Sequence, residues 1–138
     1  MIQKRSTLIT FQKTISTMNN ITLKYPKSYL TILNQIFEIE NKLKKVQEQN
    51  SIQRNIDRLK DFFANEALSD GQGLAYHNPI GENYDETRTD CEASISGASF
   101  ENLEIIEVLK PIIHVKVGNT KMVIQKAIVI VQTKNLNQ

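Results

Sequence analysis

The sequence predicts an α+β protein, in which an N-terminal helical hairpin or coiled-coil dimerisation segment precedes a small all-β domain. Residues 27–70 contain neither glycine nor proline and carry apolar residues at helical spacing. Residues 74–134 are instead rich in valine and isoleucine, with turn residues at intervals. We therefore divide the chain into a flexible basic arm (residues 1–26), the helical segment (27–70) and the β-domain (71–134).

The composition fits a soluble, cytoplasmic protein. The chain has 138 residues, of which 40% are apolar, enough to bury a core. Its single cysteine, Cys91, excludes an intramolecular disulfide and favours a reducing compartment. No apolar run approaches the roughly 20 residues that a membrane-spanning helix needs.

The arm concentrates positive charge. The first acidic residue is Glu38, so residues 1–37 carry a net charge of +5 and the remainder −3. A basic start rich in serine and threonine is typical of an organelle transit peptide or of a nucleic-acid-binding arm. A flexible basic tail is the simplest interpretation, and we expect its removal up to residue 24 to leave folding intact.

The first half of the helical segment shows a heptad pattern. Apolar residues recur at three-and-four spacing over three heptads: Tyr29, Ile32, Ile36, Ile39, Leu43 and Val46. The next equivalent position is Asn50, a polar residue that can fix register or lie in a turn. Leu30, Leu33 and Phe37 widen the apolar face, which suits a helical bundle better than a two-stranded coil.

A second apolar series is offset from the first. It consists of Ile52, Ile56, Leu59 and Phe63. The offset fits either one long helix with a phase slip or a helical hairpin that turns at Gln49–Ser51. We slightly favour the hairpin, because Ser51 can cap a second helix and two hairpins can form a four-helix dimer. We expect homodimerisation through Tyr29, Ile32, Ile36, Ile39, Leu43, Val46, Ile56, Leu59 and Phe63.

The β-domain reads as about five strands. Ile113, Val115 and Val117 alternate with polar residues, and Gly118-Asn119 is typical of a two-residue type II′ hairpin turn. We expect residues 122–124 to pair back across this turn, and further strands at 91–96 and 103–109. Residues 127–131 are apolar on both faces, which predicts a central strand or one that meets a partner.

A search for catalytic, metal and cofactor sites finds no convincing set. The imidazoles are His77 and His114, and a triad of His77, Asp85 and Cys91 would place its thiol in a strand, where nothing lowers the thiol pKa. We interpret Cys91 as a small buried thiol. A metal site from His77, Glu82, Asp85 and Cys91 lacks ligand pairs at zinc-like spacing. Glu82 and Asp85 lie in a turn region, where hydrogen bonding is their expected use.

Three stretches of the sequence, taken in their order along the chain, resemble motifs of a known family. Asn78-Pro-Ile-Gly-Glu-Asn-Tyr-Asp85, Ile106-Glu-Val-Leu-Lys-Pro111 and Val123-Ile-Gln-Lys-Ala-Ile-Val-Ile-Val131 resemble motifs in the wing of GrpE, the nucleotide exchange factor of DnaK-type chaperones. The resemblance covers roughly residues 50–134. Departures are Ile112-Ile113 in place of a Gly-Tyr, Cys91 in place of a histidine, Gln125 in place of a basic residue, and a missing or short stalk helix.

The resemblance implies a non-enzymatic co-chaperone. In this family a helical bundle dimerises the protein, and the wing contacts the nucleotide-binding domain of the chaperone so that ADP leaves. The motif match implies partner-binding roles for Leu109, Lys121, Met122 and Val131, with core packing as the alternative for Leu109 and Val131. A homodimeric adaptor without exchange activity remains open, as does a nucleic-acid-binding dimer that uses the arm.

Overall fold

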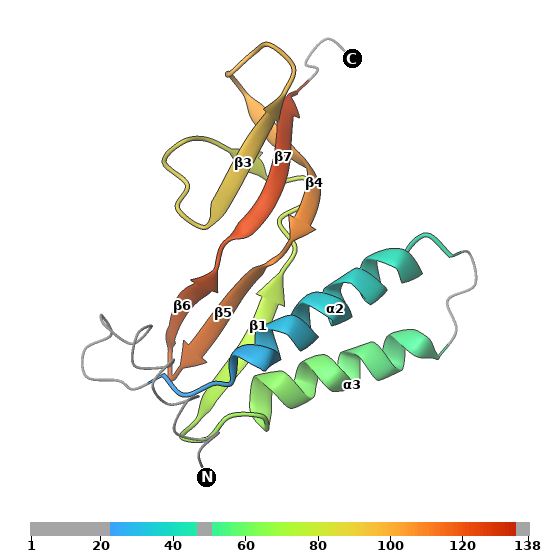
Figure 1. Cartoon of the computed structure of the whole chain (residues 1–138), viewed down its shortest axis with the longest axis vertical. Coiled ribbons are helices and arrows are strands. Elements are labelled where there is room, and N and C mark those ends of the chain that lie inside the picture. Colours follow the sequence, from blue (N-terminus) through green and yellow to red (C-terminus); the bar gives the residue numbers. More distant parts are fainter. Residues whose placement is uncertain (1–22, 47–50, 135–138) are drawn as a thin grey trace. The chain divides into compact units, whose positions relative to one another are not determined.

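A computed structural model describes residues 23–46 and 51–134, and they form an α+β protein of two helices followed by β-strands (Figure 1). The chain separates into a first unit, Met1–Gly73, and a second, Leu74–Gln138. We describe each unit by itself.

The two helices of the first unit form an antiparallel hairpin. Helix α2 spans Lys27–Leu43 and helix α3 spans Ile52–Asn65. Tyr29, at the start of α2, packs edge to face on Phe63, near the end of α3, with ring centroids 5.3 Å apart. At the opposite end, Glu40 accepts a hydrogen bond of 3.1 Å from Nε2 of Gln53. The predicted hairpin is confirmed and the single long helix is wrong. Most of the predicted turn, Gln49–Ser51, lies outside the described residues.

The start of α2 differs from the expected one. Pro26, in an extended conformation (φ −68°, ψ 135°), occupies the N-cap position, and Ser28 lies inside the first turn. A proline is compatible with this place because the first helical N–H groups have no partner within the helix. Ser51 does precede α3, as expected, but its side chain makes no capping hydrogen bond.

The last residues of the predicted arm are packed. Leu23 and Tyr25 are buried, and the backbone N–H of Lys24 lies 3.5 Å from Oε1 of Gln72. The flexible arm therefore cannot extend to residue 26, and its residues 1–22 lie outside the described part of the chain. Two apolar side chains among polar neighbours give too weak a pattern to reveal this burial from sequence.

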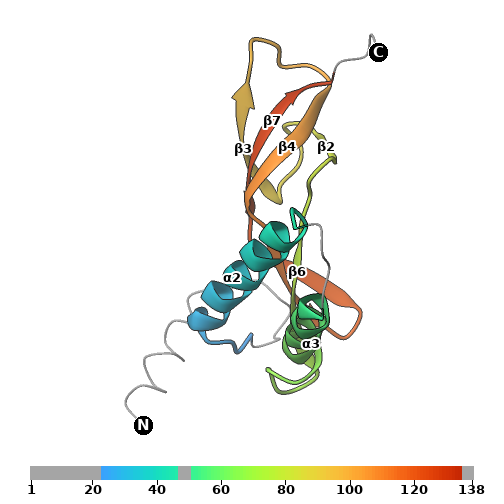
Figure 2. The ribbon, with the colours of Figure 1, turned by 90° about the vertical axis from the view of Figure 1, so that its right-hand side faces the viewer.

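In the described residues seven strands form two sheets, where the sequence indicated about five strands. The three-stranded sheet has the order β1 (Gln72–His77), β5 (Ile112–Val117), β6 (Thr120–Gln125). The four-stranded sheet has the order β2 (Asn83–Tyr84), β4 (Leu103–Lys110), β7 (Ala127–Thr133), β3 (Cys91–Ser96), as seen in Figure 2.

One long hairpin, residues 103–133, runs through both sheets. β4 continues into β5 through Pro111, and β6 continues into β7 through Lys126 (Figure 1). The amide of Gln125 donates to the carbonyl oxygen of Pro111 at 3.0 Å, which ties the two strands together where they change sheet. At the tip, Gly118 has φ +60°, as a primed hairpin turn requires.

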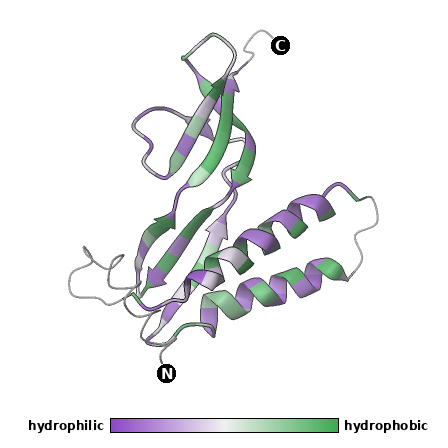
Figure 3. Ribbon diagram, viewed as in Figure 1, coloured by the Kyte–Doolittle hydropathy of each residue, from purple (hydrophilic) through white to green (hydrophobic). Residues whose placement is uncertain are grey.

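The core of the four-stranded sheet lies on one face. Its buried members are Cys91, Leu103, Ile105, Ile112, Ala127, Val129 and Val131. β7 supplies three of them and pairs with β3 in parallel and with β4 antiparallel. β7 is therefore an interior strand of its sheet, which agrees with one of the two alternatives for 127–131, and Figure 3 shows its continuous apolar sequence.

Candidate protein-contact surfaces

The segment between β1 and β3 is fixed by a turn and by β4. Residues 79–82 form a turn closed by the N–H of Glu82 and the carbonyl of Pro79 at 3.1 Å, with Gly81 at φ +82°. The N–H of Gly81 donates to the carbonyl of Ile105, and the N–H of Ile105 donates to the carbonyl of Glu82, both at 2.9 Å. The first stretch of the family resemblance is therefore a turn fastened to β4.

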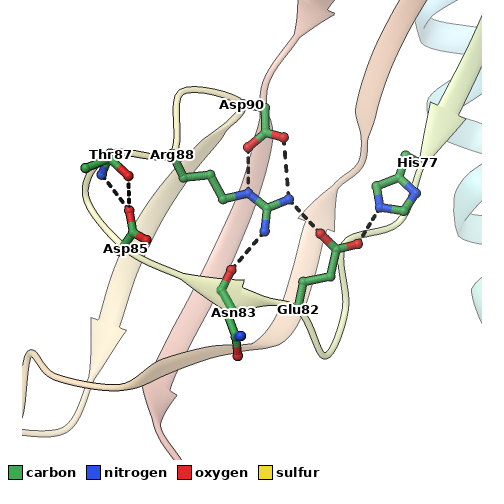
Figure 4. A network of polar contacts seen from close by, with 7 residues as sticks. All are labelled: His77, Glu82, Asn83, Asp85, Thr87, Arg88 and Asp90. Carbon is green, nitrogen blue, oxygen red and sulfur yellow. Dashed lines mark hydrogen bonds and ion pairs between the residues drawn. The ribbon is translucent and has the colours of Figure 1, made fainter.

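Arg88 organises the rest of this segment (Figure 4). Its guanidinium donates to Asp90 and to Glu82, each at 2.7 Å, and to the backbone carbonyl of Asn83 at 2.9 Å. Glu82 also contacts Nε2 of His77. The guanidinium thus joins three points that are up to eight residues apart in sequence, and it supplies the positive charge between the two carboxylates.

The network shifts the pKa values of both carboxylates downward. For Asp90, the hydrogen bond from Arg88 is the main cause of a lowered pKa. For Glu82, burial alone would raise the pKa, but hydrogen bonds from Arg88 and His77 outweigh it and lower the pKa. Asp85 has a lowered pKa because the hydroxyl and N–H of Thr87 donate to it. Asp85 therefore makes the predicted turn hydrogen bonds.

The residues weighed as a catalytic triad or a metal site, His77, Glu82, Asp85 and Cys91, have other roles in the described structure. Cys91 is buried in the core, and burial is the main cause that raises the pKa of its thiol to about 11, so it is protonated at neutral pH. Within residues 23–46 and 51–134, no three histidine, cysteine or acidic side chains group as they would around a metal ion. Where Glu82 and Asp90 approach, the Arg88 guanidinium lies between them.

Two β-bulges redirect apolar side chains on β4. The pairing of β4 with β7 shifts between Ile105 and Glu107, and again between Val108 and Lys110, so Ile106 and Leu109 are the extra residues. An extra residue bends the strand and re-aims a side chain. Ile106 is 43% exposed and Leu109 is 51% exposed. Sequence analysis placed Leu109 on this strand but gave no sign of either bulge.

The bulge residues belong to an apolar patch on the sheet face opposite the core. Cross-strand partners share a face, so Ile130 lies beside Glu107 and Ile128 beside Lys110. Each bulge adds its extra residue next to these pairs. We call Ile106, Leu109, Ile128 and Ile130 the outer face. Glu107 and Lys110 of β4 and Glu92 of β3 are the cross-strand partners of Ile130 and Ile128, so charged side chains stand among the apolar ones on this face.

The other three residues implied by the resemblance differ in exposure. Lys121 is exposed and Met122 is half-buried, both on β6. Val131 is fully buried in the core of the four-stranded sheet, so its side chain is not part of a contact surface. Core packing, the alternative use of Val131, is what the structure shows, because residues alternate between the two faces of β7.

The residues expected at a dimer interface divide into two groups. Ile36, Leu43, Ile56 and Phe63 are buried within the chain, and Tyr29 is half-buried. The remaining four are exposed: Ile32, Ile39, Val46 and Leu59. Ile32, Ile39 and Val46 are each seven residues apart, so those within α2 share one helix face. Val46 follows the end of α2.

Comparisons with known proteins identify no relative. No protein-family model, no curated protein and no solved structure matches the chain significantly. In the part of the chain that the structure describes, neither helix is long and apolar enough to cross a membrane.

Proposed function

We propose that the chain acts by binding, as a GrpE-like co-chaperone. In this proposal, the outer face contacts the nucleotide-binding domain of a DnaK-type chaperone and promotes the release of ADP. One observation carries the proposal: the strand that contributes the second stretch of the family resemblance exposes two large aliphatic residues, Ile106 and Leu109, at two separate bulges. Exposed apolar patches of this kind usually mark contact sites.

The local structure supports a preformed contact surface. β4 lies between β2 and β7 in its sheet, and the turn at Gly81 is hydrogen-bonded to Ile105, next to the first bulge. A preformed patch loses little conformational entropy on binding. A ligand can change the conformation of its partner only by binding one state more tightly than another. The outer face would therefore have to fit the open nucleotide cleft better than the closed one.

A homodimer is the second part of the proposal. The exposed series Ile32, Ile39 and Val46 has heptad spacing, and Leu59 on the other helix is exposed as well. A second copy would cover these residues and give a four-helix arrangement in which each copy contributes one hairpin. The protein would act in the cytoplasm, where its single cysteine stays reduced.

Release of fluorescent ADP from a DnaK-type ATPase of the same cell tests the exchange activity. The wild type should accelerate release, and Leu109→Asp should abolish most of the effect because a buried carboxylate disrupts an apolar contact. Phe100→Asp is the matched control, since Phe100 is 72% exposed in the loop between β3 and β4 and lies outside the outer face. Equal activity of all three proteins would place the contact elsewhere.

A homodimeric adaptor without exchange activity is the second candidate. The family's Gly-Tyr is replaced by Ile112-Ile113, both of which are buried, and the Val131 position is a core position. These departures favour a scaffold that keeps the fold with a different partner. An unchanged rate of ADP release with every DnaK-type chaperone of the cell, together with outer-face-dependent capture of another protein, would support the adaptor.

A further inference from the structure

The C-terminal part of the chain is free of acidic residues. The last one is Glu107, and residues 108–138 contain five lysines, so this stretch carries +5. The acidic residues all lie in 38–107, where 15 of them face seven basic residues, which gives −8. The hairpin of β5 and β6 lies within this basic stretch.

The pairing of β5 and β6 brings two lysines together. Lys116 and Lys121 are direct cross-strand partners, and both are exposed. Like charges opposite each other on a sheet are destabilising. No acidic side chain lies within ion-pair distance of either lysine among the described residues. His114, which pairs with Val123 two positions along, shares this face, and the positive charge of Lys121 helps burial to lower its pKa.

Among residues 23–46 and 51–134, β6 is an edge strand with one unpaired side. It pairs with β5 alone, and no other described backbone group bonds to residues 120–124. Alternate N–H and C=O groups of an edge strand point away from its neighbour and can pair with an added strand. Met122, Val123 and Ile124 give this edge apolar side chains on both faces, which an added strand can contact.

We propose that the edge of β6 binds an extended acidic segment of a partner protein as an additional strand. The backbone of the segment pairs with β6, and its carboxylates lie on the same sheet face as Lys121. Lys116 lies one strand further away. The Debye length of about 8 Å at physiological salt, together with the length of a lysine side chain, spans that separation. This inference rests on the proposed function in one respect, because the acidic segment is assigned to the partner that would contact Lys121 and Met122.

Charge and composition argue against the other occupants. The chain's own residues 1–22 carry +3, a charge of the same sign as the lysines of this edge. A second copy that paired through β6 would bring one lysine-bearing edge against another. A nucleic acid would need arginine or aromatic side chains on which its bases stack, and residues 108–138 contain neither arginine nor phenylalanine, tyrosine or tryptophan.

Fluorescence anisotropy of the full chain with a labelled peptide tests the proposal without any chaperone. The probe is a 12-residue peptide of alternating glutamate and valine. A second probe carries N-methyl groups at alternate residues, which blocks strand pairing and leaves its charge unchanged. The variants are Lys116→Glu and Lys121→Glu, singly and together. Lys45→Glu, an exposed lysine after α2, is the control with the same change in net charge.

The unmodified probe should bind, and both N-methylation of the probe and substitution of the two lysines should weaken its binding. N-methylation and the double variant should each weaken binding about tenfold or more, and Lys45→Glu less than about twofold. Lys116→Glu is informative about folding, because it replaces a repulsive cross-strand pair with an attractive one and should weaken the probe without unfolding the protein.

Four results would overturn the proposal. The first is no binding of the probe at 100-fold the protein concentration, and the second is equal binding of the N-methylated probe. The third is tighter binding of an oligo-dT of equal charge. The fourth is dimerisation of the chain through β6, which light scattering would detect as a change in mass on Lys121→Glu. A failure of ADP release leaves the peptide result standing, so the two proposals can fail separately.

Discussion

Arg88 makes several polar contacts in the segment between β1 and β3. It links Glu82, Asp90 and the Asn83 carbonyl, and thereby holds the segment between β1 and β3. The two carboxyl pKa values lie below the ordinary 4.5 and 3.8. A depressed carboxyl pKa contributes stability above the unfolded-state value, and this stability is lost as pH falls through the folded-state value.

We therefore predict an acid-dependent effect of Arg88→Met. At pH 7 the variant should lose about 1 kcal/mol of unfolding free energy, a modest value because Glu82 is partly exposed and solvent screens the pair. Toward pH 2 the difference from wild type should shrink, since the wild-type carboxylates take up protons as the pH falls through their folded-state pKa values. Urea unfolding at both pH values measures this. An equal loss at both pH values would show that Arg88 stabilises by packing alone.

Gly73 lies where the structure leaves no room for a side chain, a requirement that no sequence pattern indicates. It lies at the start of β1, and a Cβ atom there would overlap the carbonyl oxygen of Ala64, with the carbonyl carbon 3.0 Å away. Both are backbone atoms, which cannot rotate aside. We predict that Gly73→Ala costs about 3 kcal/mol or more in thermal unfolding. Gly71→Ala is the comparison: its space is open, and only its φ of +71° opposes the change. Equal stability of Gly73→Ala and wild type would contradict the close approach.

Single residues are also where sequence reasoning succeeded least. Heptad and alternation patterns assign a residue to an element, but they cannot tell a bulge from regular pairing, so the exposure of Ile106 could not be predicted. The resemblance implied a partner-binding role for Val131 with core packing as the alternative, and the alternation of β7 puts Val131 with Val129 on the core face. The acid-free stretch 108–138 could have been found by counting, and it points to the basic face of the hairpin.

At the scale of elements, the hairpin of β5 and β6 agrees with the sequence in strand, turn and pairing. The alternation at 113–117 and the Gly118-Asn119 turn are local signals, and they were sufficient. The two sheets were not foreseen, because they depend on the pairing of β7 with β3 and β4, strands that lie well before it in the sequence. The end of α2 was also missed, because apolar spacing continues to Val46, past Leu43, where the helix ends.

The like-charged pair in this hairpin predicts a substitution that stabilises the protein, whereas most substitutions lower the free energy of unfolding. Lys116→Glu should raise the free energy of unfolding by about 0.5 kcal/mol, because it places an opposite charge across from Lys121. The gain should fade at 1 M salt, which screens exposed charges. Lys45→Glu should change stability by less. A stabilisation that persists at high salt would point to a cause other than charge pairing.

At the scale of the whole molecule, the account predicts a dimer. Ile39→Asp should give a folded monomer by light scattering and circular dichroism, because Ile39 is 49% exposed and its change leaves the buried helix residues in place. Thr31→Asp, exposed on α2 and turned about 100° around the helix from Ile32, should stay dimeric. A compact wild-type monomer at high concentration would rule out the interface.

The central claim is that the outer face is the contact surface, and methyl NMR of the full chain tests it most directly. On addition of the nucleotide-free ATPase domain of a DnaK-type chaperone, the account predicts shifts or broadening of the Ile106, Leu109 and Ile128 methyl signals. The methyl signals of the core residues Leu103 and Ile105 should change much less. Changes confined to the helices, or a spectrum that does not respond to the ATPase domain, would contradict the claim.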